Sequence, residues 1–260
     1  MLYKRYQDAR DAAWRTLLRF EIDRLPVDVE KIARGFGIVP QPWPDKTQTP
    51  RLYGLLPRHA AAASLRISGV WHIFLQSGLS YSRYRFALAH ELGHIILQHK
   101  TIRLDAAVYT FEGRENAGDV LAEPFSDADQ DADMFAIRLM APACVLHSLH
   151  VKTAWELGAL CGLPDEAAAM RADRMALLDN RNAFYTHPLE KQVRMRFAPF
   201  IQEKARKPLP SKATAAPEAP APLPLPGKSS TPPKKGFPLW AGLAVAGAAL
   251  MILLLVRWPF

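Results

Sequence analysis

The sequence predicts an α+β fold in which a mostly helical body carries a small antiparallel sheet. Residues 51–76 are rich in β-branched and aromatic side chains, and segments with helical spacing of apolar residues lie on both sides of them. Farther on, nine prolines fall within 205–237, and the 18 residues of 239–256 carry no charge. We therefore expect a folded domain over 1–204, a flexible linker over 205–237 and one transmembrane helix over 238–257.

The elements of the body are delimited by proline, glycine and polar residues. The strands are predicted in RLYGLLP, ASLRIS and WHIFLQ, with a tight turn at Ser68-Gly69 between the last two. Residues 82–99 are largely apolar all round, which indicates a helix buried on most sides. Residues 100–124 are predicted to be mostly loop. Other helices are expected near the N-terminus and at 127–140, 153–161, 164–178 and 187–204.

Most of the positive charge lies near the end of the chain. Residues 201–260 hold eight of the 33 Lys and Arg residues but two of the 25 Asp and Glu residues, so they supply most of the formal net charge of +8. The body is nearly neutral, which disfavours direct nucleic-acid binding. Cys144 and Cys161 have neither zinc-site nor disulfide-rich spacing, and we expect buried, reduced thiols.

The central motif is His90-Glu91-Leu92-Gly93-His94, an HExxH sequence within the predicted buried helix. Histidines four residues apart project from the same helix face, so both imidazoles can bind one zinc ion. Glu91 is then placed to accept a proton from metal-bound water. Two imidazoles and a carboxylate are costly to bury unless something binds them. The motif therefore predicts a catalytic zinc centre with Glu91 as its base.

A catalytic zinc ion with these two histidines needs a third protein ligand. The helix predicted over 127–140 carries Asp129 and Asp133 one turn apart in the middle of its apolar face. Because buried carboxylates need partners, we assign Asp129 as the third ligand and Asp133 as the acceptor that orients a ligand histidine. Asp131 and Glu123 remain alternatives to Asp129.

Other polar residues near the motif are predicted to face away from the metal. Asp127, Asp131 and Arg138 share the opposite face of the 127–140 helix, which we expect to face solvent. On the helix predicted over 82–99, His99 lies about 140° round the axis from His94, so it is predicted to point away from the metal as a helix-end residue.

Two segments in combination resemble the ImmA/IrrE family of metallo-endopeptidases. They are HELGHIILQH at 90–99 and DQDADMFAIRLMAP at 129–142, where the family has HExxH and then a helix of the type ExxxN or ExxxD followed by FAxxLLMP. The resemblance covers about residues 8–200 and implies a zincin-like metallopeptidase body. Carried over position by position, it implies that His90 and His94 bind zinc and that Glu91 is catalytic. Asp129 stands where the family has a ligand Glu, and its side chain is one methylene shorter.

The resemblance implies a zinc-dependent endopeptidase whose substrates are regulatory proteins, such as helix-turn-helix repressors. Tyr185, His187 and Arg138 are candidates for stabilising the oxyanion, and the strand predicted at 71–76 is a candidate for pairing with an extended substrate.

Two other functions stay open. One is a DNA-binding regulator with structural zinc, because 153–178 has the spacing of a helix-turn-helix. The other is a membrane-tethered binding protein without turnover. Glu91 argues against both, because a structural zinc site does not require it.

The charge distribution around the apolar run predicts an orientation in the membrane. The N-terminal segment has charges every few residues, unlike a secretory signal, and Lys228, Lys234 and Lys235 precede the run while Arg257 follows it. We therefore expect a single-pass protein of the cell membrane, with the catalytic body in the cytoplasm and the C-terminus outside.

Overall fold

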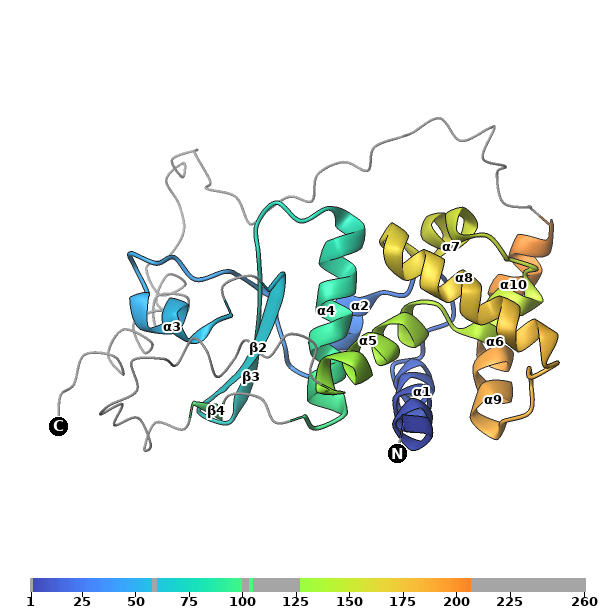
Figure 1. Ribbon diagram of the computed structural model, residues 1–260, viewed down its shortest axis with the longest axis horizontal. Helices are drawn as coiled ribbons and strands as arrows, with labels where there is room; N and C mark the ends of the chain where they lie inside the picture. Colours follow the sequence, from blue (N-terminus) through green and yellow to red (C-terminus); the bar gives the residue numbers. More distant parts are fainter. Residues whose placement is uncertain (1, 58–59, 100–102, 105–126, 207–260) are drawn as a thin grey trace, which may run out of the picture. The chain divides into compact units, whose positions relative to one another are not determined.

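Helices dominate the architecture, and a small sheet lies at one side of them (Figure 1). The computed structural model describes residues 2–57, 60–99, 103–104 and 127–206. In chain order, these residues form α1 (Leu2–Arg19), α2 (Val29–Gly35), β1 (Gln41–Pro42), α3 (Pro50–Leu55), β2 (Ala62–Ile67), β3 (Val70–Leu75), α4 (Tyr81–Ile96), β4 (Arg103–Leu104), α5 (Asp127–Met140), α6 (Ala143–Ser148), α7 (Ala154–Cys161), α8 (Asp165–Asn180), α9 (Pro188–Arg196) and α10 (Ala198–Arg206).

The sheet is mixed, so the prediction of a purely antiparallel sheet is wrong. Its strand order is β1-β3-β2-β4, and β2 and β3 form the predicted antiparallel hairpin. Ser68 and Gly69 both have positive φ, at 49° and 83°, as the tight turn between these strands requires. The two-residue strands β1 and β4 pair in parallel with β3 and β2. Such short edge strands leave too little sequence pattern to be predicted.

Two other boundary predictions are corrected by the structure. The segment RLYGLLP, predicted as a strand, forms α3, because Pro50 at the first helical position favours a helix start. The single helix predicted at 187–204 is divided into α9 and α10 at Phe197. Strand β3 lies between β1 and β2. Because Phe74 and Leu75 of β3 pair with both neighbours, these two residues cannot pair with a substrate, and the hypothesis of substrate pairing at 71–76 is left only for the start of the strand.

Helix α4 is the centre of the fold. It packs against the sheet through β2 and β3 and against α5 on another side (Figure 1). Leu88, Ala89 and Leu92 are fully buried, which confirms the prediction of a helix buried on most sides. The Ser80 side chain accepts a hydrogen bond from the backbone N–H of Arg83 and so caps the N-terminus of α4.

Arg85 fixes α4 to the last residue of α7 and to the segment between α1 and α2. Its guanidinium is buried and donates hydrogen bonds to the carbonyls of Cys161, at 2.9 Å, and Val27. Gly162 caps α7 in the left-handed conformation beside this guanidinium. The predicted burial of both cysteines is confirmed, and burial raises the pKa of Cys144 and of Cys161 to about 12.

The predicted transmembrane helix, and with it the single-pass localisation, is corrected. Among the residues that the structure describes, no helix has the length and apolar character needed to cross a membrane. The described residues form an α+β fold. The predicted span at 238–257 lies outside them, as do residues 207–237 of the linker predicted at 205–237 and most of the loop predicted at 100–124.

Gly93, inside the HExxH motif, lies close to the backbone of α5. A Cβ atom added at Gly93 would lie 3.0 Å from Ala132 Cα and 3.2 Å from the Ala132 carbonyl oxygen, both on the backbone of α5. A methyl group here can be accommodated only if the two helices separate by a few tenths of an ångström.

We expect Gly93→Ala to be less stable than Gly158→Ala by about 1–3 kcal/mol, the usual cost of overpacking. Gly158 is a matched control because it also lies in a helix, α7, and its added Cβ would lie 3.7 Å from its nearest neighbour, at ordinary contact distance. Both variants gain helix propensity, so their difference isolates the contact with α5. Denaturant unfolding in the presence of a chelator measures it, and equal stabilities would show that α4 and α5 separate freely.

Candidate metal centre

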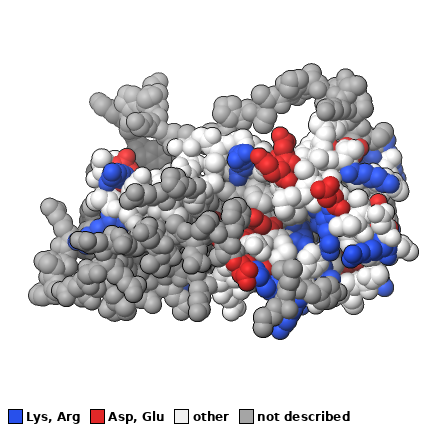
Figure 2. Space-filling view, in the orientation of Figure 1, with Lys and Arg blue, Asp and Glu red and all other residues white. Residues whose placement is uncertain are grey.

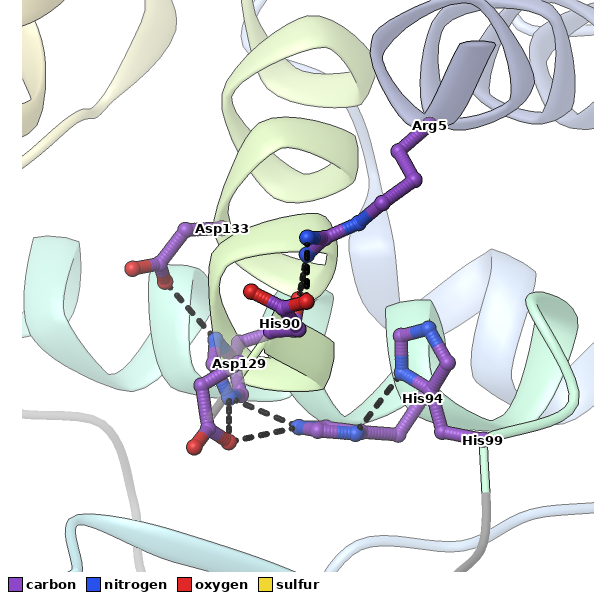
Figure 3. Close-up of polar contacts among 7 residues, drawn as sticks. Arg5, His90, His94, His99, Asp129 and Asp133 are labelled. Carbon is purple, nitrogen blue, oxygen red and sulfur yellow. Dashed lines mark hydrogen bonds and ion pairs between the residues drawn. The ribbon is translucent and has the colours of Figure 1, made fainter. Parts of the chain in front are cut away.

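Three side chains from α4 and α5 converge on one point. The Nε2 atoms of His90 and His94 lie 3.0 Å apart, and Asp129 Oδ1 lies 3.9 Å from the first and 3.3 Å from the second (Figure 3). The three side chains are partly buried, and one ligand atom from each lies within 4.8 Å of the others, so this cluster can hold a metal ion. The structure thus brings together the three residues that the sequence assigns as ligands.

The spacing of these atoms fits zinc. Ligand atoms bonded at about 2.0–2.1 Å to a tetrahedral zinc ion lie roughly 3.3 Å from one another. The separations of 3.0, 3.3 and 3.9 Å lie on either side of that value. Two imidazoles and one carboxylate are also a donor set that catalytic zinc sites use, and they leave a fourth position open.

Asp133 contacts the outer nitrogen of His90. Its Oδ1 lies 2.8 Å from His90 Nδ1, so the ring donates its Nδ1 proton to the carboxylate (Figure 3). A neutral imidazole carries one proton, so Nε2 of His90 then has its lone pair directed at His94 and Asp129. This is the contact that the sequence analysis assigns to Asp133.

Glu91 is buried beneath the cluster and has a partner that the sequence did not indicate. Ser64 of β2 donates hydrogen bonds to the Glu91 carboxylate from its side chain and from its backbone N–H. Burial raises the pKa of Glu91, while the charge of His90 and the two hydrogen bonds oppose that rise, and the net pKa is above the ordinary value. A buried carboxyl with a raised pKa suits proton transfer near neutral pH.

His99 lies against His94, so the prediction that it points away is wrong. Its Nδ1 is 3.0 Å from His94 Nδ1, and the two rings meet edge to face with centroids 5.0 Å apart (Figure 3). The prediction extended the helix to residue 99, but α4 ends at Ile96 and Gln98 has a φ of 57°. This left-handed residue turns the chain back and returns His99 to the motif.

His90 and His94, the two candidate ligand histidines, have opposite pKa shifts. Burial lowers the pKa of His90, but the hydrogen bond to Asp133 and the nearby carboxylates outweigh it, and the pKa is raised. Burial and the charges of His90 and His99 lower the pKa of His94 to about 4. His94 is therefore neutral at pH 7, which is the form that binds a metal ion.

Helix α1 covers part of the face of α5 that was predicted to face solvent, whereas Asp127 on that face is exposed, as predicted. Arg5 donates two hydrogen bonds to the Asp131 carboxylate, at 2.9 and 3.0 Å, and forms an ion pair with Asp127 at 2.7 Å. Arg138 is buried, with its guanidinium 4.1 Å from the ring centroid of Tyr6. Asp131 is thus paired with Arg5, whereas the other alternative ligand, Glu123, lies outside the described residues.

The three oxyanion candidates have their contacts elsewhere in the fold. Tyr185 hydroxyl lies 2.8 Å from His147 Nδ1, and His187 accepts a hydrogen bond from the backbone of Leu189 at the start of α9. Arg138 donates to the Met134 carbonyl and packs on α1. The contacts of these residues therefore give no support for a role at the cluster.

The sequence of this region matches a known peptidase family. Residues 57–173 match the family model Peptidase_M78, described as the IrrE N-terminal-like domain. This match supports the ImmA/IrrE family. The Peptidase_M78 match also points to a peptidase-type hydrolase and includes Ser64, the HExxH motif and all of α5, but not α1 with Arg5. The search of curated proteins found no match.

We expect Asp129→Ala to abolish tight zinc binding and Asp131→Ala to preserve it, although both aspartates lie in the first turns of α5. Asp129 Oδ1 faces both imidazoles, whereas Asp131 faces Arg5. Loss of Asp131 should instead lower the midpoint of denaturant unfolding, because it releases α1 from α5. Zinc titration and urea unfolding of both full-length variants test this difference. Loss of zinc from Asp131→Ala together with retention by Asp129→Ala would contradict the assignment.

Proposed function

We propose that this protein is a zinc-dependent endopeptidase that hydrolyses peptide bonds in protein substrates. The observation that carries the proposal is the convergence of His90, His94 and Asp129 from two helices, with Glu91 buried between the two histidines on α4. A structural zinc site would need a fourth ligand and no base. Among the residues that the structure describes, the cluster instead combines three candidate ligands with a carboxyl that has its own hydrogen-bond donors.

A bound zinc ion supplies a Lewis acid, which polarises a carbonyl group and makes a water molecule more acidic. The protein's own groups then do the remaining work. Glu91 accepts a proton from the attacking water and returns it to the leaving amine. Ser64 holds the Glu91 carboxylate from β2, and Asp133 accepts the Nδ1 proton of His90, so in the neutral ring the Nε2 atom is the one left to bind the metal.

We propose regulatory proteins, such as helix-turn-helix repressors, as the substrate class. The resemblance of the HExxH and α5 segments to the ImmA/IrrE family supports this choice, and the Peptidase_M78 match over residues 57–173 is consistent with it. The partner of this protein is thus a protein or peptide substrate rather than a nucleic acid.

The DNA-binding alternative receives no support from the helix that would enter the major groove. The exposed residues of α8 include Asp165, Glu166 and Asp173, whereas Arg171 is buried and donates to the Ala141 carbonyl. On the face drawn in Figure 2, acidic and basic side chains are interspersed among the described residues. A helix that reads DNA presents exposed basic side chains to phosphates, so we favour the enzyme.

We expect Glu91→Gln to bind zinc like the native protein and to have lost proteolysis, because Glu91 is a base and not a ligand. His90→Ala should lose both zinc and activity. Glu166→Gln, an exposed glutamate on α8, is a matched control that should retain both. The measurements are zinc content and the new protein N-termini found by mass spectrometry in cells that carry each variant. If Glu91→Gln produces the same new N-termini as the native protein, the peptidase proposal is wrong.

A further inference from the structure

The two ligand histidines are held by different kinds of partner. His90 donates through Nδ1 to the Asp133 carboxylate, 2.8 Å away on α5. His94 has no carboxylate in the equivalent position among its described contacts, and its Nδ1 faces Nδ1 of His99 at 3.0 Å. The contact of His94 with His99 therefore takes the place that Asp133 has beside His90.

The geometry of the His94–His99 pair allows one proton arrangement when His94 binds a metal through Nε2. That ring must be neutral and must carry its single proton on Nδ1. Because 3.0 Å between two nitrogen atoms is a hydrogen-bond distance, His99 Nδ1 must be the acceptor. The proton of His99 is then on its Nε2 atom.

The chain fold fixes this acceptor in place. Gln98 turns the backbone back after α4, and the backbone N–H of His99 donates to the His94 carbonyl at 3.0 Å. His99 is thus tied to His94 through both its backbone and its ring. In Figure 3 the ring of His99 lies on one side of His94, and His90 and Asp129 lie on the other.

We propose that His99 is a positioning residue that holds the His94 ring in the tautomer and orientation that present Nε2 to the metal. This inference rests on the proposed zinc function. His99 acts through His94 and not on the substrate, so its loss should weaken zinc binding first. Metal-ligating histidines commonly have such an outer partner, and its removal typically lowers metal affinity by roughly ten- to a hundred-fold.

Two substitutions at this position separate the acceptor from the bulk of the ring. His99→Phe keeps an aromatic ring against His94 but removes the acceptor. His99→Asn removes the ring but places an amide oxygen near the position of Nδ1. His150→Phe is the matched control, because His150 is an exposed histidine just after α6.

Zinc affinity of the full-length variants is measured by competition with a chromophoric chelator, and [15N]histidine NMR of the zinc-loaded proteins reports the protonation of each ring nitrogen. We expect His99→Phe to bind zinc ten- to a hundred-fold more weakly, His99→Asn to recover most of that loss, and His150→Phe to match the native protein. In the native protein, NMR should show a protonated Nδ1 on His94 and an unprotonated Nδ1 on His99.

The proposal is overturned if His99→Phe binds zinc like the native protein, or if His99→Asn binds no better than His99→Phe. It is also overturned if NMR shows a protonated Nδ1 on His99 in the zinc-loaded protein. These measurements need no substrate. A native protein that binds zinc as described but fails to cleave any protein would therefore refute the peptidase function and leave the role of His99 intact.

Discussion

The close packing of α4 on α5 is the contact on which the candidate site depends. Two candidate ligands come from α4 and the third comes from α5, so the distance between the helices sets the distance between the atoms that could bind the metal. Gly93 permits this approach because it has no side chain to meet the backbone of Ala132. The glycine of HELGH therefore allows the two helices to pack closely. A wider helix pair would move Asp129 away from both imidazoles.

Each functional side chain of α4 is paired with a group from a different part of the chain. His90 contacts Asp133 of α5, Glu91 accepts hydrogen bonds from Ser64 of β2, and His94 contacts His99 beyond the helix end. Burying imidazoles and carboxylates without such partners would cost several kcal/mol. The surrounding elements thus supply a partner that helps to hold each of these side chains in place.

The sequence predicts the parts of this centre that depend on local periodicity. The positions of His90, His94, Asp129 and Asp133 follow from helical geometry alone, and the structure places all four at one point. Helix α4 and the β2–β3 hairpin could be predicted in the same way, because their patterns are long and regular.

Predictions failed where contacts between distant segments decide the structure. Helical periodicity placed Asp131 and Arg138 on a face of α5 that was expected to face solvent. Periodicity within one helix cannot show that α1 packs against that face. His99 was misplaced because one left-handed residue, Gln98, ends the helical geometry. The contact of Ser64 with Glu91 could not be predicted, since the spacing of residues in a predicted strand does not identify the partner of a serine within it.

The pairing of Arg5 with α5 joins two segments that lie far apart along the chain. Arg5 and Asp131 are separated by 126 positions, and His90 and Asp133 by 43, so the centre is assembled from contacts that are distant along the chain. Contacts of this kind form late in folding, because long loops must close before they are made. A ribosome-bound chain that ends at residue 99 contains His90, Glu91 and His94 of the motif but neither Asp129 nor Asp133. Tight metal binding at the candidate centre would thus require α5, and a chain that ends before α5 would lack the third candidate ligand.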